Sequence, residues 1–123
     1  PEMFFQKVVH DTEILYDIKY YKGIILGESA GAELLLKRYF ITKENNYYPY
    51  FAFYDGFGVL NDPFYFDVHS ISSKDYFDVL QKVSDDTKKN VYAIFDDGVI
   101  IYQSTLQIEL FGHVEFFCPN IDR

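Results

Sequence analysis

The sequence has little of what several classes of protein require. Its single cysteine, Cys118, allows neither an internal disulfide nor a metal site built from several thiolates. No apolar run approaches the roughly 20 residues of a membrane-spanning helix. The first residues also lack the basic region and continuous apolar stretch of a signal peptide. These absences indicate a cytoplasmic protein without a membrane partner.

Positive charge is scarce as well. Lys and Arg number 11 against 19 Asp and Glu, a net charge of −8, and such a surface repels nucleic-acid phosphates. There is neither a G-x-G-x-x-G motif nor a phosphate-binding loop, so no cofactor is expected. The pairs Asp85-Asp86 and Asp96-Asp97 lack the ligand spacing of a calcium loop, and they are interpreted as polar turns without a metal.

What the sequence does contain fits one globular domain over residues 1–123. Apolar residues at three- and four-residue spacings predict a helix over residues 2–21. The apolar run 24–26 is typical of a strand buried on both faces of a parallel sheet. Glycines at 27–31 then turn the chain, and strong helix formers predict a helix at 32–40. Strand, tight turn and helix in this order make half of an α/β unit.

The second half of the chain is predicted to be richer in strands. Ser72 or Ser73 is expected to cap a helix with an apolar face, and the turn Asp96-Asp97-Gly98 predicts a hairpin. The strands are therefore expected to end in a small antiparallel meander. The predicted elements are strands at 57–60 and 65–69, a helix at 74–83, and β-rich segments at 91–95, 99–103 and 105–117.

The run Gly27-Glu28-Ser29-Ala30-Gly31 matches the G-x-S-x-G nucleophile elbow. Its glycines are expected to make room for a sharp turn that holds Ser29 in a strained backbone conformation. The Ala30 N–H then points to where a tetrahedral oxyanion would form. The alternative interpretation is an ordinary glycine-rich turn.

A serine needs a neighbouring base, and the chain offers three histidines. His69 follows an apolar strand, at the kind of strand end where α/β sheets place their sites. It is the candidate base, with a structural histidine as the alternative. His10 and His113 are expected to be solvated or structural.

These motifs together resemble the S51 serine peptidases, the family of aspartyl dipeptidase and cyanophycinase. Residues 21–32 are similar to the family's G-x-S-A-G-A elbow. Residues 54–60, followed by Phe66-Asp67-Val68-His69, are similar to its D-G-L-G-L segment and catalytic histidine. Residues 91–98 are similar to a further strand and turn of the family.

The resemblance implies an α/β fold, the flavodoxin-like three-layer sandwich of the class I glutamine amidotransferases. It implies a triad of Ser29, His69 and an acid between them in sequence, placed at Glu44 with Asp55 or Asp67 as alternatives. The Ala30 N–H would serve the oxyanion hole. The implied activity is cleavage of a small peptide or isopeptide through a Ser29 acyl-enzyme, without a cofactor.

The N-terminal part of the sequence departs from the family, whose members carry several parallel strands before the elbow. We therefore expect the chain to be the C-terminal part of a larger peptidase domain, paired with a missing N-terminal portion or with a second copy. Two other functions stay open at this point. One is an α/β-hydrolase esterase, which shares the elbow, and the other is a non-catalytic remnant that acts as a binding or structural partner.

Overall fold

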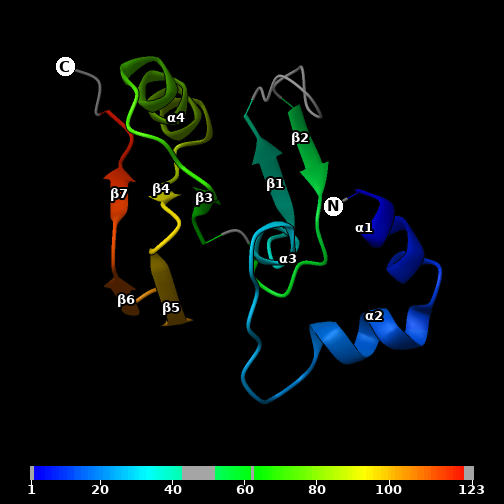
Figure 1. Cartoon of the computed structure of the whole chain (residues 1–123). Helices are drawn as coiled ribbons and strands as arrows, with labels where there is room; N and C mark the ends of the chain where they lie inside the picture. The colour runs from blue at the N-terminus through cyan, green and yellow to red at the C-terminus, as the bar shows by residue number, and fades with distance from the viewer. Residues whose placement is uncertain (1, 43–51, 62, 121–123) are drawn as a thin grey trace. The chain divides into compact units, whose positions relative to one another are not determined.

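The computed structural model describes residues 2–42, 52–61 and 63–120, and the chain divides into two compact units, Pro1–Asp62 and Pro63–Arg123 (Figure 1). The elements of the first unit are α1 (Glu2–Val9), α2 (Thr12–Lys19), α3 (Ala30–Glu33), β1 (Arg38–Ile41) and β2 (Ala52–Asp55). Those of the second unit are β3 (Tyr65–Asp67), α4 (Lys74–Thr87), β4 (Val91–Ile94), β5 (Val99–Ser104), β6 (Gln107–Phe111) and β7 (Val114–Phe117).

The helix predicted over residues 2–21 is divided into α1 and α2. Asp11 caps α2, and its side-chain oxygen accepts hydrogen bonds from the backbone N–H groups of Glu13 at 3.2 Å and Ile14 at 3.1 Å. An N-cap residue has a non-helical backbone, so a continuous helix cannot pass through Asp11. In the same unit the ring of Phe5 in α1 stacks on Phe57, with 5.7 Å between the ring centroids.

The helix predicted at 32–40 is wrong beyond Glu33, where α3 ends. After α3 the chain enters β1, which pairs antiparallel with β2 and buries Tyr39, Phe40 and Ile41. Tertiary pairing has overridden local helix propensity here. The strand predicted at 57–60 is also wrong, because β2 ends before it and only Leu60 forms an isolated bridge, with Leu36.

The second unit contains a three-stranded sheet in the order β3-β4-β7. β3 and β4 are parallel, with Asp67 opposite Ala93, and α4 makes the crossover between them (Figure 1). Ser73 caps α4, as the sequence predicts, with its hydroxyl accepting from the Tyr76 N–H at 3.4 Å. The helix packs on one face of the sheet, where Phe77 meets Phe117 at 5.4 Å between ring centroids.

The other face of this sheet carries a cluster of aromatic rings. Tyr92 lies 5.1 Å from Phe64 and 5.3 Å from Phe116 between ring centroids. Successive strand residues point to opposite faces, so Tyr92 and its register partner Phe66 lie opposite Asp67 and Ala93. Burial raises the pKa of the Tyr92 hydroxyl.

The predicted fold class is wrong. A three-layer sandwich needs a central parallel sheet, whereas the described strands form three small sheets, β1-β2, β3-β4-β7 and β5-β6. The apolar run 24–26 lies in no strand of the described chain; Ile24 and Leu26 are exposed, and Ile25 is half-buried. The C-terminal meander is wrong as well, because β4 pairs with β7 and the turn at Asp96 leads into a separate hairpin, β5-β6.

The described helices are short compared with the roughly 20 residues of a membrane-spanning helix. α4 has 14 residues, and in the described part of the chain no helix is long and apolar enough to cross a bilayer.

Candidate functional site

Ser29 has the strained backbone that the elbow motif predicts. Its φ is 52° and its ψ is −123°, which lies outside the left-handed helical well and is unfavourable for a residue with a side chain. Such a conformation costs on the order of 1–3 kcal/mol and persists only where the surroundings hold it. Here the Gly31 N–H donates to the Glu28 carbonyl oxygen at 2.8 Å, and the Ala32 N–H donates to that of Ser29 at 3.0 Å.

The two glycines of the motif play different parts. A Cβ atom at Gly27 would lie 2.7 Å from the Cα of Ala32 and 2.9 Å from the carbonyl oxygen of Gly31, so only glycine fits there. A Cβ at Gly31 would meet nothing within 4 Å. The expectation that a side chain would crowd the turn at either glycine is therefore correct for Gly27 and wrong for Gly31.

The surroundings of the elbow differ from the expected strand and helix. Residues 24–28 are outside any strand, and the following helix, α3, has only 4 residues, so its dipole is small. The Ala30 N–H as an oxyanion donor stays a prediction. Glu33, at the end of α3, is buried with 5% of its surface exposed.

His69 lies just beyond β3 and also has a positive φ, 52°. Its Nδ1 atom lies 2.8 Å from Oδ1 of Asp96, within hydrogen-bonding distance. The two side chains are 67% and 85% exposed, so the pair adds little to stability. What it supplies is orientation, because the carboxylate fixes one ring nitrogen of the imidazole.

Asp96 is the residue that the sequence analysis missed, since it was interpreted as part of a polar turn. His69 follows β3 and Asp96 follows β4, and these strands are parallel neighbours. The carboxyl ends of parallel neighbours meet at the same edge of a sheet, so pairing β3 with β4 from the sequence would have placed the two side chains together.

Two glycines allow the turn that contains Asp96 to lie close to the turn between β6 and β7. A Cβ at Gly98 would collide with the carbonyl oxygen of His113, and one at Gly112 with that of Asp97. Gly112 also has a φ of 70°, which glycine adopts without strain. The turn that carries Asp96 is thus packed tightly against the turn between β6 and β7.

The other histidines take structural or exposed positions. The ring of His113 stacks on Phe95 at 3.7 Å between centroids, and its Nε2 lies 3.0 Å from Oε1 of Glu115. His10 is exposed after α1. His69 and His113 thus each contact a carboxylate, and the His113 side chain is the less exposed of the two, at 44% against 67%.

The predicted acids are found in three different situations. Glu44 lies outside the described residues. Asp55 is exposed at the end of β2, while Asp67 is buried in β3 and accepts a hydrogen bond from Tyr76. The structure places Ser29 in the first unit and brings His69 and Asp96 together in the second.

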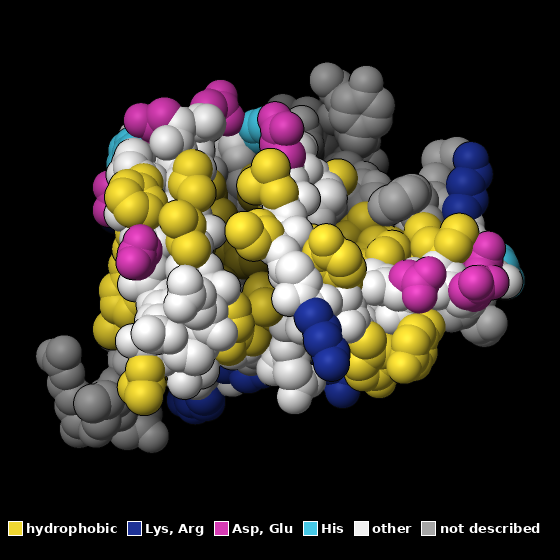
Figure 2. Space-filling model, turned by 90° about the horizontal axis from the view of Figure 1, so that it is seen from below, with side chains coloured by type: hydrophobic (Ala, Val, Ile, Leu, Met, Phe, Trp, Pro, Cys, Tyr) yellow, Lys and Arg dark blue, Asp and Glu magenta, His cyan; other side chains and the backbone are white. Residues whose placement is uncertain are grey.

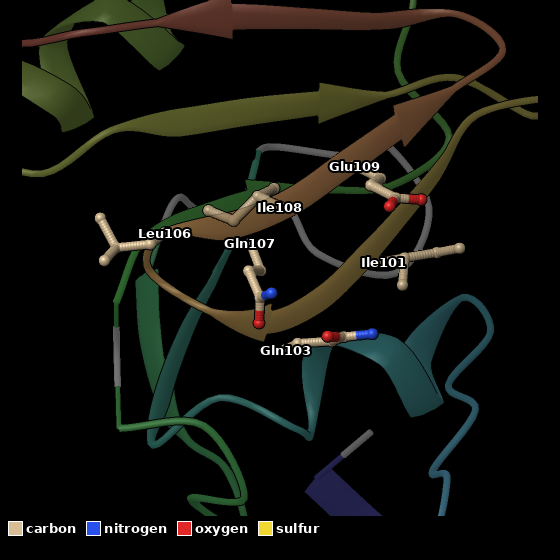
Figure 3. A pocket seen from close by; sticks show the side chains of 6 residues that line it. All are labelled: Ile101, Gln103, Leu106, Gln107, Ile108 and Glu109. Atoms are coloured by element: carbon tan, nitrogen blue, oxygen red, sulfur yellow. The ribbon is translucent and has the colours of Figure 1, made fainter.

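The described residues offer neither a metal site nor a hollow that contains catalytic side chains. Among the described residues no group of three or more His, Cys, Asp or Glu side chains is placed to hold a metal ion. The hollow, of 290 Å³, lies along the β5-β6 hairpin (Figure 3). Its lining contains no nucleophile paired with a base: Ile101, Gln103, Leu106, Gln107, Ile108 and Glu109.

The comparisons with known proteins do not assign a family to this arrangement. No family model matches the chain, and neither does a curated protein or a solved structure. The resemblance to S51 peptidases therefore rests on the motif residues themselves.

Proposed function

We propose that this chain is a serine-type hydrolase that cleaves a small peptide or isopeptide, with Ser29 as nucleophile and His69 as general base. The observation that carries the proposal is the backbone of Ser29, a non-glycine residue at φ 52° and ψ −123° inside a G-x-S-x-G sequence. Strain of this kind concentrates at functional sites.

The geometry around His69 supports its role as the base. A carboxylate only accepts hydrogen bonds, so the Nδ1 atom that faces Asp96 carries the proton. The Nε2 atom is then unprotonated and can take the proton of the Ser29 hydroxyl. The His69 side chain is 67% exposed, and the proposal requires its Nε2 atom to approach Ser29 in the active protein.

The reaction would follow the two steps of acyl transfer. Ser29 Oγ attacks the carbonyl carbon while His69 accepts its proton, and the Ala30 N–H stabilises the oxyanion. His69 then gives the proton to the leaving amine. Water, activated by the same imidazole, hydrolyses the acyl-enzyme and restores Ser29.

A fluorophosphonate probe, which reacts covalently with activated serines, tests the proposal directly. We expect peptide mass spectrometry to find the adduct on Ser29, because this serine stands in the G-x-S-x-G sequence with a strained backbone. Labelling should disappear in Ser29→Ala and persist in the control Ser72→Ala, which changes an exposed serine before α4. A folded wild-type chain that stays unlabelled would refute the proposal.

A second candidate function, association with another polypeptide, is favoured by a different observation. Apolar side chains, drawn in yellow, are visible at the surface in Figure 2. By exposed fraction, the most exposed large apolar residues of the first unit are Ile24 at 94% and Leu26 at 91%. Ile24 and Leu26 stand two positions apart in residues 24–28, which lie in no strand. An exposed apolar segment of this kind can pair with a second copy of the chain or with a preceding portion of the protein.

Association through this segment predicts a change in molecular mass. We expect light scattering to show the isolated wild-type chain forming dimers with rising concentration, and the double variant Ile24→Lys/Leu26→Lys staying monomeric because charge opposes burial. The matched control is Leu106→Lys, a residue 93% exposed in the second unit. Equal association of both variants, or a monomeric wild type at every concentration, would exclude pairing with a second copy.

A further inference from the structure

We infer that Tyr76, with Asp67 and Ser70, positions His69 for catalysis by holding the chain on both sides of this histidine. The inference concerns residues that do not themselves touch a substrate. It rests on the proposed function for its catalytic meaning, while the hydrogen bonds that carry it are independent of that function.

The three side chains form a connected group between α4 and the end of β3. The Tyr76 hydroxyl donates to Oδ2 of Asp67 at 2.7 Å, and the Ser70 hydroxyl lies 2.7 Å from the Tyr76 oxygen. Asp67 and Ser70 are 5% and 8% exposed. A carboxylate so far from water is destabilising unless hydrogen bonds compensate, so the Tyr76 hydroxyl contributes more than a surface contact would.

The protons of this group can be assigned. Tyr76 has one hydroxyl proton, and it is directed to Asp67. The Ser70 hydroxyl therefore donates to the Tyr76 oxygen at 2.7 Å, in preference to its 3.4 Å contact with the Asp67 carbonyl oxygen. Loss of the Tyr76 hydroxyl would break two hydrogen bonds of the group at once.

Two members of this group, Asp67 and Ser70, stand on either side of His69 in the sequence. Asp67 is held by its place opposite Ala93 in the sheet, and the Ser70 N–H donates to the Ile94 carbonyl oxygen at 3.2 Å. Only Val68 and His69 lie between the two fixed ends, and this short span includes the positive φ of His69. Because both ends are fixed, His69 keeps its strained backbone and its ring stays within reach of Asp96.

The test is Tyr76→Phe, which removes the hydroxyl and keeps the ring. In the wild type we expect the ¹⁵N resonance of a His69 Nδ1 atom that carries the proton and is bound to a carboxylate. In Tyr76→Phe we expect this resonance to broaden or vanish, and kcat to fall about 10- to 100-fold with KM unchanged, as for other residues that orient a functional side chain. The matched control is Tyr92→Phe on the opposite face of the sheet, which should change neither quantity.

The NMR readout separates this inference from the proposed function, because it needs no substrate. If the resonance disappears as expected but no form of the chain hydrolyses peptides, the positioning role stands and the hydrolase proposal fails. If Tyr76→Phe keeps both the resonance and the wild-type kcat, the positioning role is wrong. Should circular dichroism show Tyr76→Phe unfolded, Ser70→Ala replaces it and must weaken the same resonance, and an unchanged spectrum then overturns the inference.

Discussion

Replacing Ser29 with alanine is expected to lower kcat/KM for a small peptide substrate by at least about a thousandfold. The side-chain oxygen is the atom that attacks the carbonyl carbon, so its removal abolishes the acyl-enzyme and leaves only binding and oxyanion stabilisation. The rate of release of a chromogenic amine from a dipeptide anilide measures the effect. Circular dichroism should be unchanged, because alanine removes only one oxygen.

Two comparisons make this result interpretable. Ser72→Ala should hydrolyse at the wild-type rate, and the corresponding ester substrate should be cleaved by the wild type but not by Ser29→Ala. An equal rate in Ser29→Ala and the wild type would show that the elbow is a glycine-rich turn without a nucleophile. Cleavage of esters but not of peptides by the wild type would favour an esterase.

Asp96→Asn is expected to have the second largest effect, a loss of kcat on the order of 100- to 10,000-fold. An amide can donate a hydrogen bond to Nδ1, which shifts the imidazole proton to Nε2 and removes the base that Ser29 needs. Glu44→Gln is expected to change kcat less than about tenfold if Asp96 is the orienting acid. Steady-state kinetics over a range of pH measures both variants.

The neighbour Asp97 supplies the matched control. Asp97→Asn removes the same charge one residue away, where the carboxylate accepts from the His113 N–H at 3.4 Å rather than contacting His69. It should leave kcat near the wild-type value. A large loss in Glu44→Gln with little change in Asp96→Asn would identify Glu44 as the acid, as the S51 resemblance implies.

The elements that the sequence predicts well are those governed by local interactions. α4 is found where its apolar spacing places it, and Ser73 caps it through a hydrogen bond three residues away. Gly27 occupies a turn that a Cβ atom would block, as the elbow motif predicts. Both signals act within a few residues, so no knowledge of the rest of the chain is needed to interpret them.

Pairing between distant strands is where sequence reasoning fails. β strands near the predicted C-terminal segments are present, but β4 pairs with β7 across the intervening β5-β6 hairpin. The helix predicted at 32–40 is replaced in part by β1 because pairing with β2 buries Phe40 completely. The run 24–26 has the composition of a buried strand without strand partners in the described chain.

In the candidate site, too, local features are predictable from the sequence and features that depend on long-range pairing are not. The backbone of Ser29 follows from its motif, since Gly27 and the turn act on adjacent atoms. Asp96 could not be recognised from its own neighbours, because Asp-Asp-Gly is an ordinary turn sequence. Its meaning depends on the parallel pairing of β3 with β4, a contact between segments far apart in the chain.

The parallel register of β3 and β4 also governs how the second unit can acquire its histidine–carboxylate pair. His69 and Asp96 are separated by 27 positions, so bringing them together costs loop-closure entropy. The packing of the sheet and α4 must offset this cost. A slip of one residue would turn Asp67 to the aromatic face, away from Tyr76. Partly folded states that contain α4 alone therefore hold neither contact, and the pair arises only after β3 has paired with β4.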